Sequence, residues 1–254
     1  MIGGVNVATS QIANIYNQGN NQLSDTLAKI ASGKKFQNAG EDLLSFTRAN
    51  NLTNQIKGYN DVEQKLTAAQ TATKAAVEVG SKVYENLTKM SDLATKYSNT
   101  TDATEQAEYT AEFNSLRDTV VTALENASVD GNAIADGSYS QDIQMDPSGT
   151  TLTVALSTAP TVAADLAITA DFSQAVTDSL TFMSDAKKFN SIIEDQISLN
   201  KTIVNSKEAV RSLITDIDEA SEMSKMLDQN VRQQAAMSML SQANMSRQVV
   251  MKLY

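Results

Sequence analysis

The chain of 254 residues contains neither cysteine nor histidine. Their absence excludes zinc sites built from these ligands, catalysis by cysteine–histidine or serine–histidine–aspartate sets, and haem ligation by either residue. It also excludes disulfide bonds, so cysteine usage gives no indication of the compartment. We therefore expect a protein that is not an enzyme and that uses no cofactor or metal ion.

Proline, glycine and aromatic residues are also scarce. The two prolines lie in the middle of the chain, glycine occurs ten times, and tryptophan is absent. This composition favours long helices packed through aliphatic side chains and Met. No apolar run approaches a membrane span of about 18 residues. The first basic residue is Lys29, with no apolar segment before it, so we expect no membrane partner and no cleaved signal peptide.

The formal net charge of −10 argues against nucleic acid as a partner. The charge is unevenly distributed. Residues 1–28 carry a single charge, that of Asp25, and residues 229–254 carry three basic residues and no acidic one. Because low charge favours burial in an assembly, the two ends of the chain are candidates for an interface, whereas the acidic remainder favours solvent.

Apolar residues recur at helical spacing through most of the chain. They predict a helix over 5–31 that a serine–glycine pair ends, and an irregular segment over 32–44. Further helices are expected over about 45–97 and 104–127, with a break at 99–102.

The middle of the sequence has a different pattern. Apolar and polar residues alternate over 142–145 and 151–156, on either side of an Asp-Pro-Ser-Gly turn, which predicts a β-hairpin. A helix is then expected from about 174 to 254 with little interruption. These elements predict a mainly α fold, a long antiparallel helical rod or coiled coil with a small β-hairpin at its far end and both termini at the opposite pole.

The last forty residues are apolar on more than one side. Val231 and Leu240 lie nine positions apart, so at about 100° per residue they point in roughly opposite directions. A helix that is apolar all round must be buried all round, yet this one is a chain terminus, which usually frays in a lone molecule. We expect residues 1–28 to cover one side, and other copies of the chain to cover the rest.

Spaced motifs relate the chain to a known family. They are Ile214-x-Asp216-x-Asp218-x-Ala220-x-Glu222, Gln233-Gln234-Ala235 and Leu240-x-Gln242-Ala243-Asn244, together with Ser32-Gly33-Lys34-Lys35-Phe36, Ala39 and Glu41-Asp42 near the N-terminus. On these residues the chain resembles bacterial flagellin, whose N-terminal segment reads Ser-Gly-x-Arg-Ile-Asn-x-Ala-x-Asp-Asp. The order of the predicted elements also matches. Only 45 residues separate Ala127 from Ser173, so the chain is similar to a short, divergent member without variable outer domains.

The resemblance implies a structural subunit that polymerises into the extracellular flagellar filament for swimming. It implies an inner-tube domain of terminal helices, 1–44 and 217–254, and a helical rod domain over 45–216 with the hairpin at about 140–157. The expected assembly residues are Val5, Ile12, Tyr16, Leu23, Leu27, Ile30, Leu227, Val231, Met239, Leu240, Ala243, Asn244, Val250 and Leu253. The Met-rich tail has two interpretations, a promiscuous binding surface or packing between subunits.

Other implications concern partners and the joint between the domains. Export through the flagellar type III apparatus, a chaperone on the C-terminal segment, and hook-associated and cap proteins are implied as partners. The segment 32–44 is either a solvated loop or a spoke that switches between subunit packings. The spoke residues would be Ser32, Gly33, Lys35, Phe36, Glu41 and Asp42.

Some positions depart from the family pattern. Lys35 and Phe36 stand where the family usually has Arg and Ile, and Arg247 replaces a common Pro, which implies a straighter last helix. Ser91 stands where many members carry an Arg that innate immune receptors read. Because Ser cannot replace a bidentate Arg, we expect weak or no recognition by the flagellin-sensing Toll-like receptor.

An acidic cluster at Asp216, Asp218, Glu219 and Glu222 also has two interpretations. It could bind a hard cation through carboxylate oxygens, or form a salt-bridged helix turn beside a bend. The second is favoured, because the cluster lacks the spacing and glycine of an EF-hand.

Two alternative functions remain open from the sequence. One is a hook–filament junction protein of the same superfamily, although the Gln242-Ala243-Asn244 block favours a filament subunit. The other is a monomeric helical-bundle module, such as a secretion-system tip protein or an adhesin. Such a module should stay monomeric with its ends intact, whereas a filament subunit should polymerise.

Overall fold

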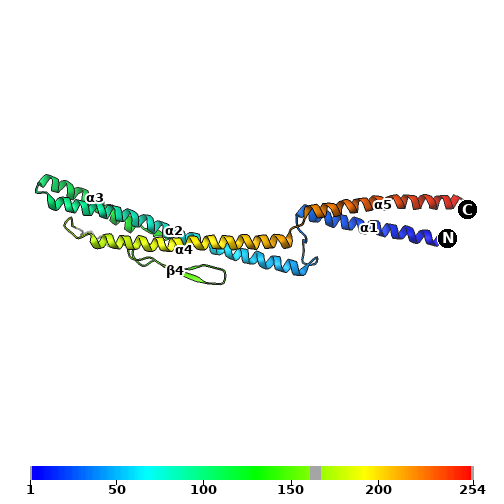
Figure 1. Ribbon diagram of the computed structural model, residues 1–254, viewed down its shortest axis with the longest axis horizontal. Coiled ribbons are helices and arrows are strands. Elements are labelled where there is room, and N and C mark those ends of the chain that lie inside the picture. Colours follow the sequence, from blue (N-terminus) through cyan, green and yellow to red (C-terminus); the bar gives the residue numbers. More distant parts are fainter. Residues whose placement is uncertain (1, 161–166, 253–254) are drawn as a thin grey trace. The chain divides into compact units, whose positions relative to one another are not determined.

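The computed structural model of the protein describes residues 2–160 and 167–252, without the side chains of residues 2–9, 246, 247 and 250–252. These ranges are mainly helical, with two small antiparallel sheets (Figure 1). The helices are α1 (Ile2–Ser32), α2 (Leu43–Asn99), α3 (Ala103–Glu125), α4 (Ser173–Thr215) and α5 (Glu219–Lys252), and the strands are β1 (Ser128–Val129), β2 (Asn132–Ala133), β3 (Ser140–Gln144) and β4 (Thr151–Ala155). The predicted mainly α class with long paired helices is confirmed. Within the described ranges, no helix has the length and apolar character that crossing a membrane requires.

The chain divides into two compact units. The terminal unit comprises residues 1–53 and 207–254, and the middle unit comprises residues 54–206. In the terminal unit, α1 and α5 pack side by side, with both chain ends at the same end of the pair (Figure 1). The predicted pairing of the charge-poor N-terminal helix with the tail is therefore confirmed.

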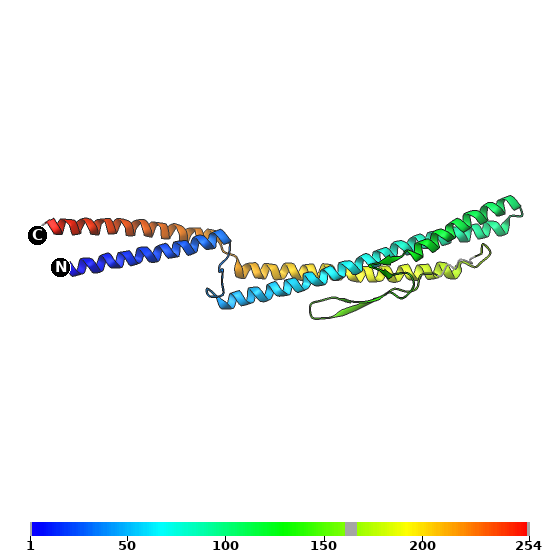
Figure 2. The same cartoon turned by 180° about the vertical axis from the view of Figure 1, so that it is seen from behind.

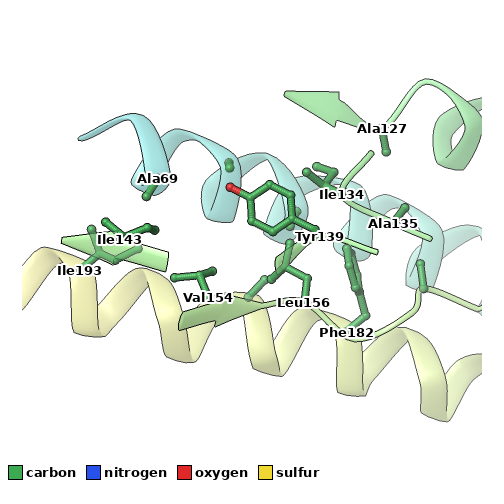
Figure 3. Close-up of a cluster of buried hydrophobic side chains, with 14 of the residues drawn as sticks. Ala69, Ala127, Ile134, Ala135, Tyr139, Ile143, Val154, Leu156, Phe182 and Ile193 are labelled. Carbon is green, nitrogen blue, oxygen red and sulfur yellow. The ribbon is translucent and has the colours of Figure 1, made fainter. Parts of the chain in front are cut away.

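In the middle unit, one apolar cluster joins α2 and α4 to the two hairpins. Figure 3 shows Tyr139, Leu156 and Phe182 converging in this cluster, and all three are almost fully buried. The helices α2 and α3 run side by side (Figure 2). A second apolar cluster lies between them and the segment that precedes α4, where the rings of Phe113 and Phe172 stack edge-on at 5.7 Å.

The helices α2 and α4 approach closely at Gly80. The Ser179 hydroxyl donates a hydrogen bond to the Gly80 carbonyl oxygen (3.1 Å). A Cβ atom on Gly80 would lie 3.0 Å from a ring carbon of Phe182. Glycine therefore gives Phe182 room to pack closely against α2, and the glycine that weakens the helical pattern of the sequence has a packing role.

The predicted hairpin is present as β3 and β4. Their register pairs Ser140 with Ala155 and Gln144 with Thr151, and Gly149 provides the positive φ of 97° that the turn requires. Its tip is fixed to α4, because the buried Asn200 amide donates to the Met145 carbonyl oxygen (3.2 Å).

A second hairpin, β1–β2, forms where the sequence shows only turn signals. It turns at Asp130 and Gly131, which both have positive φ. Strands of two residues are too short for an alternating pattern, so the sequence could not distinguish this hairpin from a loop.

The last helical stretch differs from the prediction. We expected one helix with little interruption from 174 to 254, but it is divided into α4 and α5 by residues 216–218. There the Ile217 amide donates to the Gly33 carbonyl oxygen (3.1 Å), outside either helix. Asp218 then caps α5, accepting from the Ser221 amide (3.1 Å). By contrast, α5 passes through position 247 without a break.

Candidate functional site

The terminal unit divides the predicted assembly residues into two sets. One set is half-buried on the stripe along which α1 and α5 pack. This set consists of Ile12, Tyr16, Leu23, Ile30, Leu240 and Ala243. At the centre of the stripe, Thr26 and Ala236 are buried, and the Gln233 amide donates to the Asn20 side-chain oxygen (3.2 Å). These contacts are internal to the chain.

The other set is exposed to solvent. It consists of Leu27, Leu227, Val231, Met239 and Asn244. Val231 is 63% exposed whereas Leu240 is half-buried, so the two residues do lie on different sides of α5. The side chains of Val5 and Val250, and all of Leu253, lie outside the described residues.

The exposed side of α5 carries apolar side chains in two groups, which Gln234, Ser238 and Gln242 separate. Met223, Leu227, Val231, Met245 and Val249 are between 48% and 63% exposed. Their spacings of four and fourteen positions return to one side of a helix with 3.6 residues per turn. We call these five residues the outer stripe. Together with the stripe that faces α1, it makes α5 apolar on two sides.

Sequence reasoning missed a second exposed group in the terminal unit. Leu43 and Leu44, at the start of α2, are 68% and 63% exposed, and Leu213, near the end of α4, is 77% exposed. The sequence signal that could have indicated this group is the pair of leucines, Leu43 and Leu44, directly after the helix-capping residue Asp42. Ile15 on α1 is also exposed.

The terminal unit carries most of the exposed apolar side chains, whereas the middle unit carries most of the excess negative charge. Of the fifteen large apolar side chains exposed in the described part of the chain, thirteen lie in the terminal unit. The terminal unit contains ten basic and nine acidic residues, whereas the middle unit contains ten basic and twenty-one acidic residues. Copies of the terminal unit can therefore approach one another without strong like-charge repulsion, and large exposed apolar surfaces mark interaction sites.

The predicted spoke segment contacts the junction of α4 and α5 within the terminal unit. The Lys35 amide donates to the Thr215 carbonyl oxygen (2.7 Å), and Lys34 and Asp216 form an isolated antiparallel bridge. The Lys34 ammonium is 2.5 Å from an Asp216 carboxylate oxygen. Gly33 adopts a positive φ of 68°, which ends α1 and turns the chain toward this contact.

The other predicted spoke residues lie in the same network. The Lys35 ammonium donates to the Leu213 carbonyl oxygen (2.7 Å), and the Phe36 ring stacks edge-on against Phe46 at 6.2 Å. Ser32 accepts from the Lys34 amide (3.3 Å), and Glu41 accepts from the Asn38 amide group (3.0 Å). Asp42 caps α2 by accepting from the Ser45 amide (3.0 Å). The segment is therefore held by hydrogen bonds at several points, and most of its residues remain exposed to solvent.

Each carboxylate of the acidic cluster has a local structural role. Asp216 pairs with Lys34, Asp218 caps α5, and Glu222 pairs with Lys225 at 2.7 Å. Glu219 lies in the first turn of α5, where a negative charge is favoured by the helix dipole. Within the described residues, no group of acidic side chains is arranged to hold a metal ion.

We expect the Asp216 contacts to make the joint, where residues 33–35 meet residues 215–217, sensitive to acid. The Lys34 ammonium, with the hydroxyls of Ser212 and Thr215, holds the pKa of the Asp216 carboxyl well below its ordinary value of 3.8. A depressed folded-state pKa contributes stability that is present above the unfolded value and is lost as the pH falls below it. We expect the Lys35 and Ile217 amides to lose hydrogen-exchange protection, corrected for intrinsic rates, as the pH falls below about 4.

Asp216→Asn should reproduce this loss at pH 7. Because the carboxylate is partly exposed, the decrease in protection should be modest, up to about fivefold. Asp228→Asn is the matched control, since Asp228 forms only an exposed ion pair with Arg232 on α5. Unchanged protection of both amides in Asp216→Asn would show that the ion pair does not hold the joint.

Comparisons with known proteins agree with this architecture. The family model for the bacterial flagellin N-terminal helical region matches residues 5–140, and that for the C-terminal helical region matches residues 184–254. The chain is 24% identical over 253 residues to flagellin FljO of Caulobacter vibrioides, which covers 94% of this chain and 93% of that protein. It is also 24% identical to a flagellin of Halalkalibacterium halodurans, with 92% of each chain covered.

Among solved structures, the crystal structure of Bacillus cereus flagellin is similar with a TM-score of 0.38 at 17% identity, covering 64% of this chain and 94% of that one. The two family models together account for the helices on both sides of the β3–β4 hairpin. The chain therefore belongs to the bacterial flagellin family and is a structural subunit of the flagellar filament.

Proposed function

We propose that copies of this protein pack in the filament through the terminal unit, with the outer stripe of α5 at the centre of the contact. The observation that carries this proposal is the concentration of exposed apolar side chains in the terminal unit, which has nearly balanced charge. Removing such surface from water drives association by about 25 cal/mol for each Å² buried. The acidic middle unit stays solvated.

The same proposal assigns the inner-tube domain to 1–44 and 217–254 and the outer domain to 45–216. The segment 32–44 is the spoke between them. Its support is the bridge of Lys34 to Asp216 and the paired backbone hydrogen bonds on either side of it. Because these bonds link two chain segments at a helix break, a shift of the spoke changes the direction in which α5 leaves the joint.

Export and capping partners complete the proposal. The outer stripe needs cover before assembly, and an export chaperone on the C-terminal segment would provide it. The protein would then leave the cell through the flagellar type III apparatus and polymerise between hook-associated and cap proteins. No observation favours a hook–filament junction protein or a monomeric adhesin over a filament subunit.

Seeded polymerisation tests the proposal. Purified monomer should elongate short filament fragments, and electron microscopy should show filaments that are continuous with the seeds. Protein that remains monomeric and folded at high concentration with seeds present would favour the monomeric alternative.

We also expect weak or no recognition by the flagellin-sensing Toll-like receptor. Ser91 is half-buried on α2 beside the segment 168–173, and its short side chain cannot form the bidentate contacts of an arginine. In a receptor reporter assay, the wild-type protein should give little signal and Ser91→Arg a larger one. A strong response to the wild type would contradict this expectation.

A further inference from the structure

Methionine is the readily oxidised residue type that this chain exposes. The sequence has ten methionines, no cysteine and no tryptophan. Among the described side chains, the methionines that are mostly exposed are Met223, Met237, Met239 and Met245, between 48% and 60%. All four lie on α5. By contrast, Met90 in the middle unit is fully buried, so an oxidant in solution meets thioether sulfur chiefly on this one helix.

A peroxide can oxidise the methionine side chains at these positions to methionine sulfoxide. A peroxide transfers one oxygen atom to the thioether: the sulfur–oxygen bond forms, the oxygen–oxygen bond breaks, and hydrogen peroxide leaves as water. The sulfur loses two electrons and becomes a sulfoxide, which is polar and chiral. Two of the four residues, Met223 and Met245, lie in the outer stripe together with Leu227, Val231 and Val249.

We propose that α5 carries a methionine oxidation site that controls assembly: peroxide oxidation of Met223, Met237, Met239 and Met245 in the free subunit blocks its addition to the filament. This inference rests on the proposed packing of subunits through α5. A sulfoxide oxygen buried in that contact gives up its hydrogen bonds to water. Burying a polar atom without a new hydrogen-bond donor raises the free energy of the assembled state. Because Met223 and Met245 lie in the outer stripe, the same packing shields their sulfurs once a subunit is incorporated.

The experiment compares free subunits with assembled filaments. Free subunits are treated with hydrogen peroxide, and peptide mass spectrometry follows each methionine, with Met90 as the buried reference. We expect the four α5 methionines to oxidise at least about tenfold faster than Met90, and Met223 and Met245 to oxidise about tenfold faster in free subunits than in filaments. The treated subunits should then elongate untreated seeds at least about tenfold more slowly than untreated subunits.

A variant with all four residues changed to leucine is the control. Leucine has no sulfur to oxidise, so the peroxide-treated variant should elongate seeds at the same rate as the untreated variant. Treatment with methionine sulfoxide reductases of both stereospecificities should restore elongation by the oxidised wild type.

The outcomes separate this inference from the proposed function. Normal elongation by oxidised wild-type subunits would overturn the oxidation site alone. Loss of elongation by the peroxide-treated leucine variant would also overturn it, because the sensitive group would then lie elsewhere. Failure of untreated subunits to elongate seeds would overturn both this inference and the packing proposal on which it rests.

Discussion

Replacing both Leu227 and Val231 with lysine should abolish filament growth while leaving the subunit folded. The two side chains are 58% and 63% exposed, so in the free subunit the new ammonium groups stay in water and lysine preserves the helix. In the proposed contact, by contrast, both charges would be buried without partners. Burying even one unpaired charge is strongly unfavourable, so seeded elongation followed by light scattering and electron microscopy should fall below detection.

The matched control uses exposed apolar residues of the middle unit. Leu180 and Leu199 are 41% and 51% exposed on α4, and the lysine double variant at these positions makes the same chemical change outside the proposed contact. It should elongate seeds within about twofold of the wild type, since an exposed surface substitution changes stability by only about 0.5 kcal/mol. If the Leu227→Lys/Val231→Lys variant elongated seeds at the wild-type rate with an unchanged circular dichroism spectrum, the outer stripe could not be part of the contact between subunits.

Phe182→Ala should destabilise the middle unit by about 3–5 kcal/mol. The Phe182 ring is fully buried in the cluster between α2, α4 and the hairpins (Figure 3), and it lies against the backbone at Gly80. Glycine has no side chain to move into the space, so the cavity left by the ring can only partly collapse. Urea unfolding followed by circular dichroism should show a midpoint well below that of the wild type.

Leu180→Ala is the control for this prediction, because Leu180 lies on the same helix two positions earlier and is 41% exposed. Leucine and phenylalanine differ in helix propensity by only a few tenths of a kcal/mol, roughly, so the difference in the free energy of unfolding between the two variants mainly reports the buried volume. A loss of less than about 1 kcal/mol in Phe182→Ala would mean that the cluster repacks around the missing ring.

Much of the fold follows from local patterns in the sequence. The helices arise from apolar spacing and from residues such as Asp102, which caps α3 by accepting from the Thr104 amide (2.7 Å). The β3–β4 hairpin follows from alternation on either side of a turn that needs Gly149. These signals depend on neighbours a few positions away, and they are therefore readable without the tertiary structure. The two-residue strands at Asn132 were too short to leave such a signal.

The candidate site was only partly predictable for the same reason. The sequence shows that α5 is apolar on two sides, but it cannot say that Leu240 faces the N-terminal helix and Val231 faces solvent. It also does not show that Leu43 and Leu213 remain exposed. Which side is covered depends on the partner helix that meets it.

By itself, the sequence determined the helical class, the hairpin, the charge-poor ends and the motifs that relate the chain to flagellins, because each is a property of residues near one another in the chain. Only the tertiary structure decided which apolar side of α5 stays exposed and where this helix begins. The break before α5 depends on Asp216 meeting Lys34, 182 positions away. A contact over that separation has no local signature, since its energy arises only when the folded chain brings the two segments together.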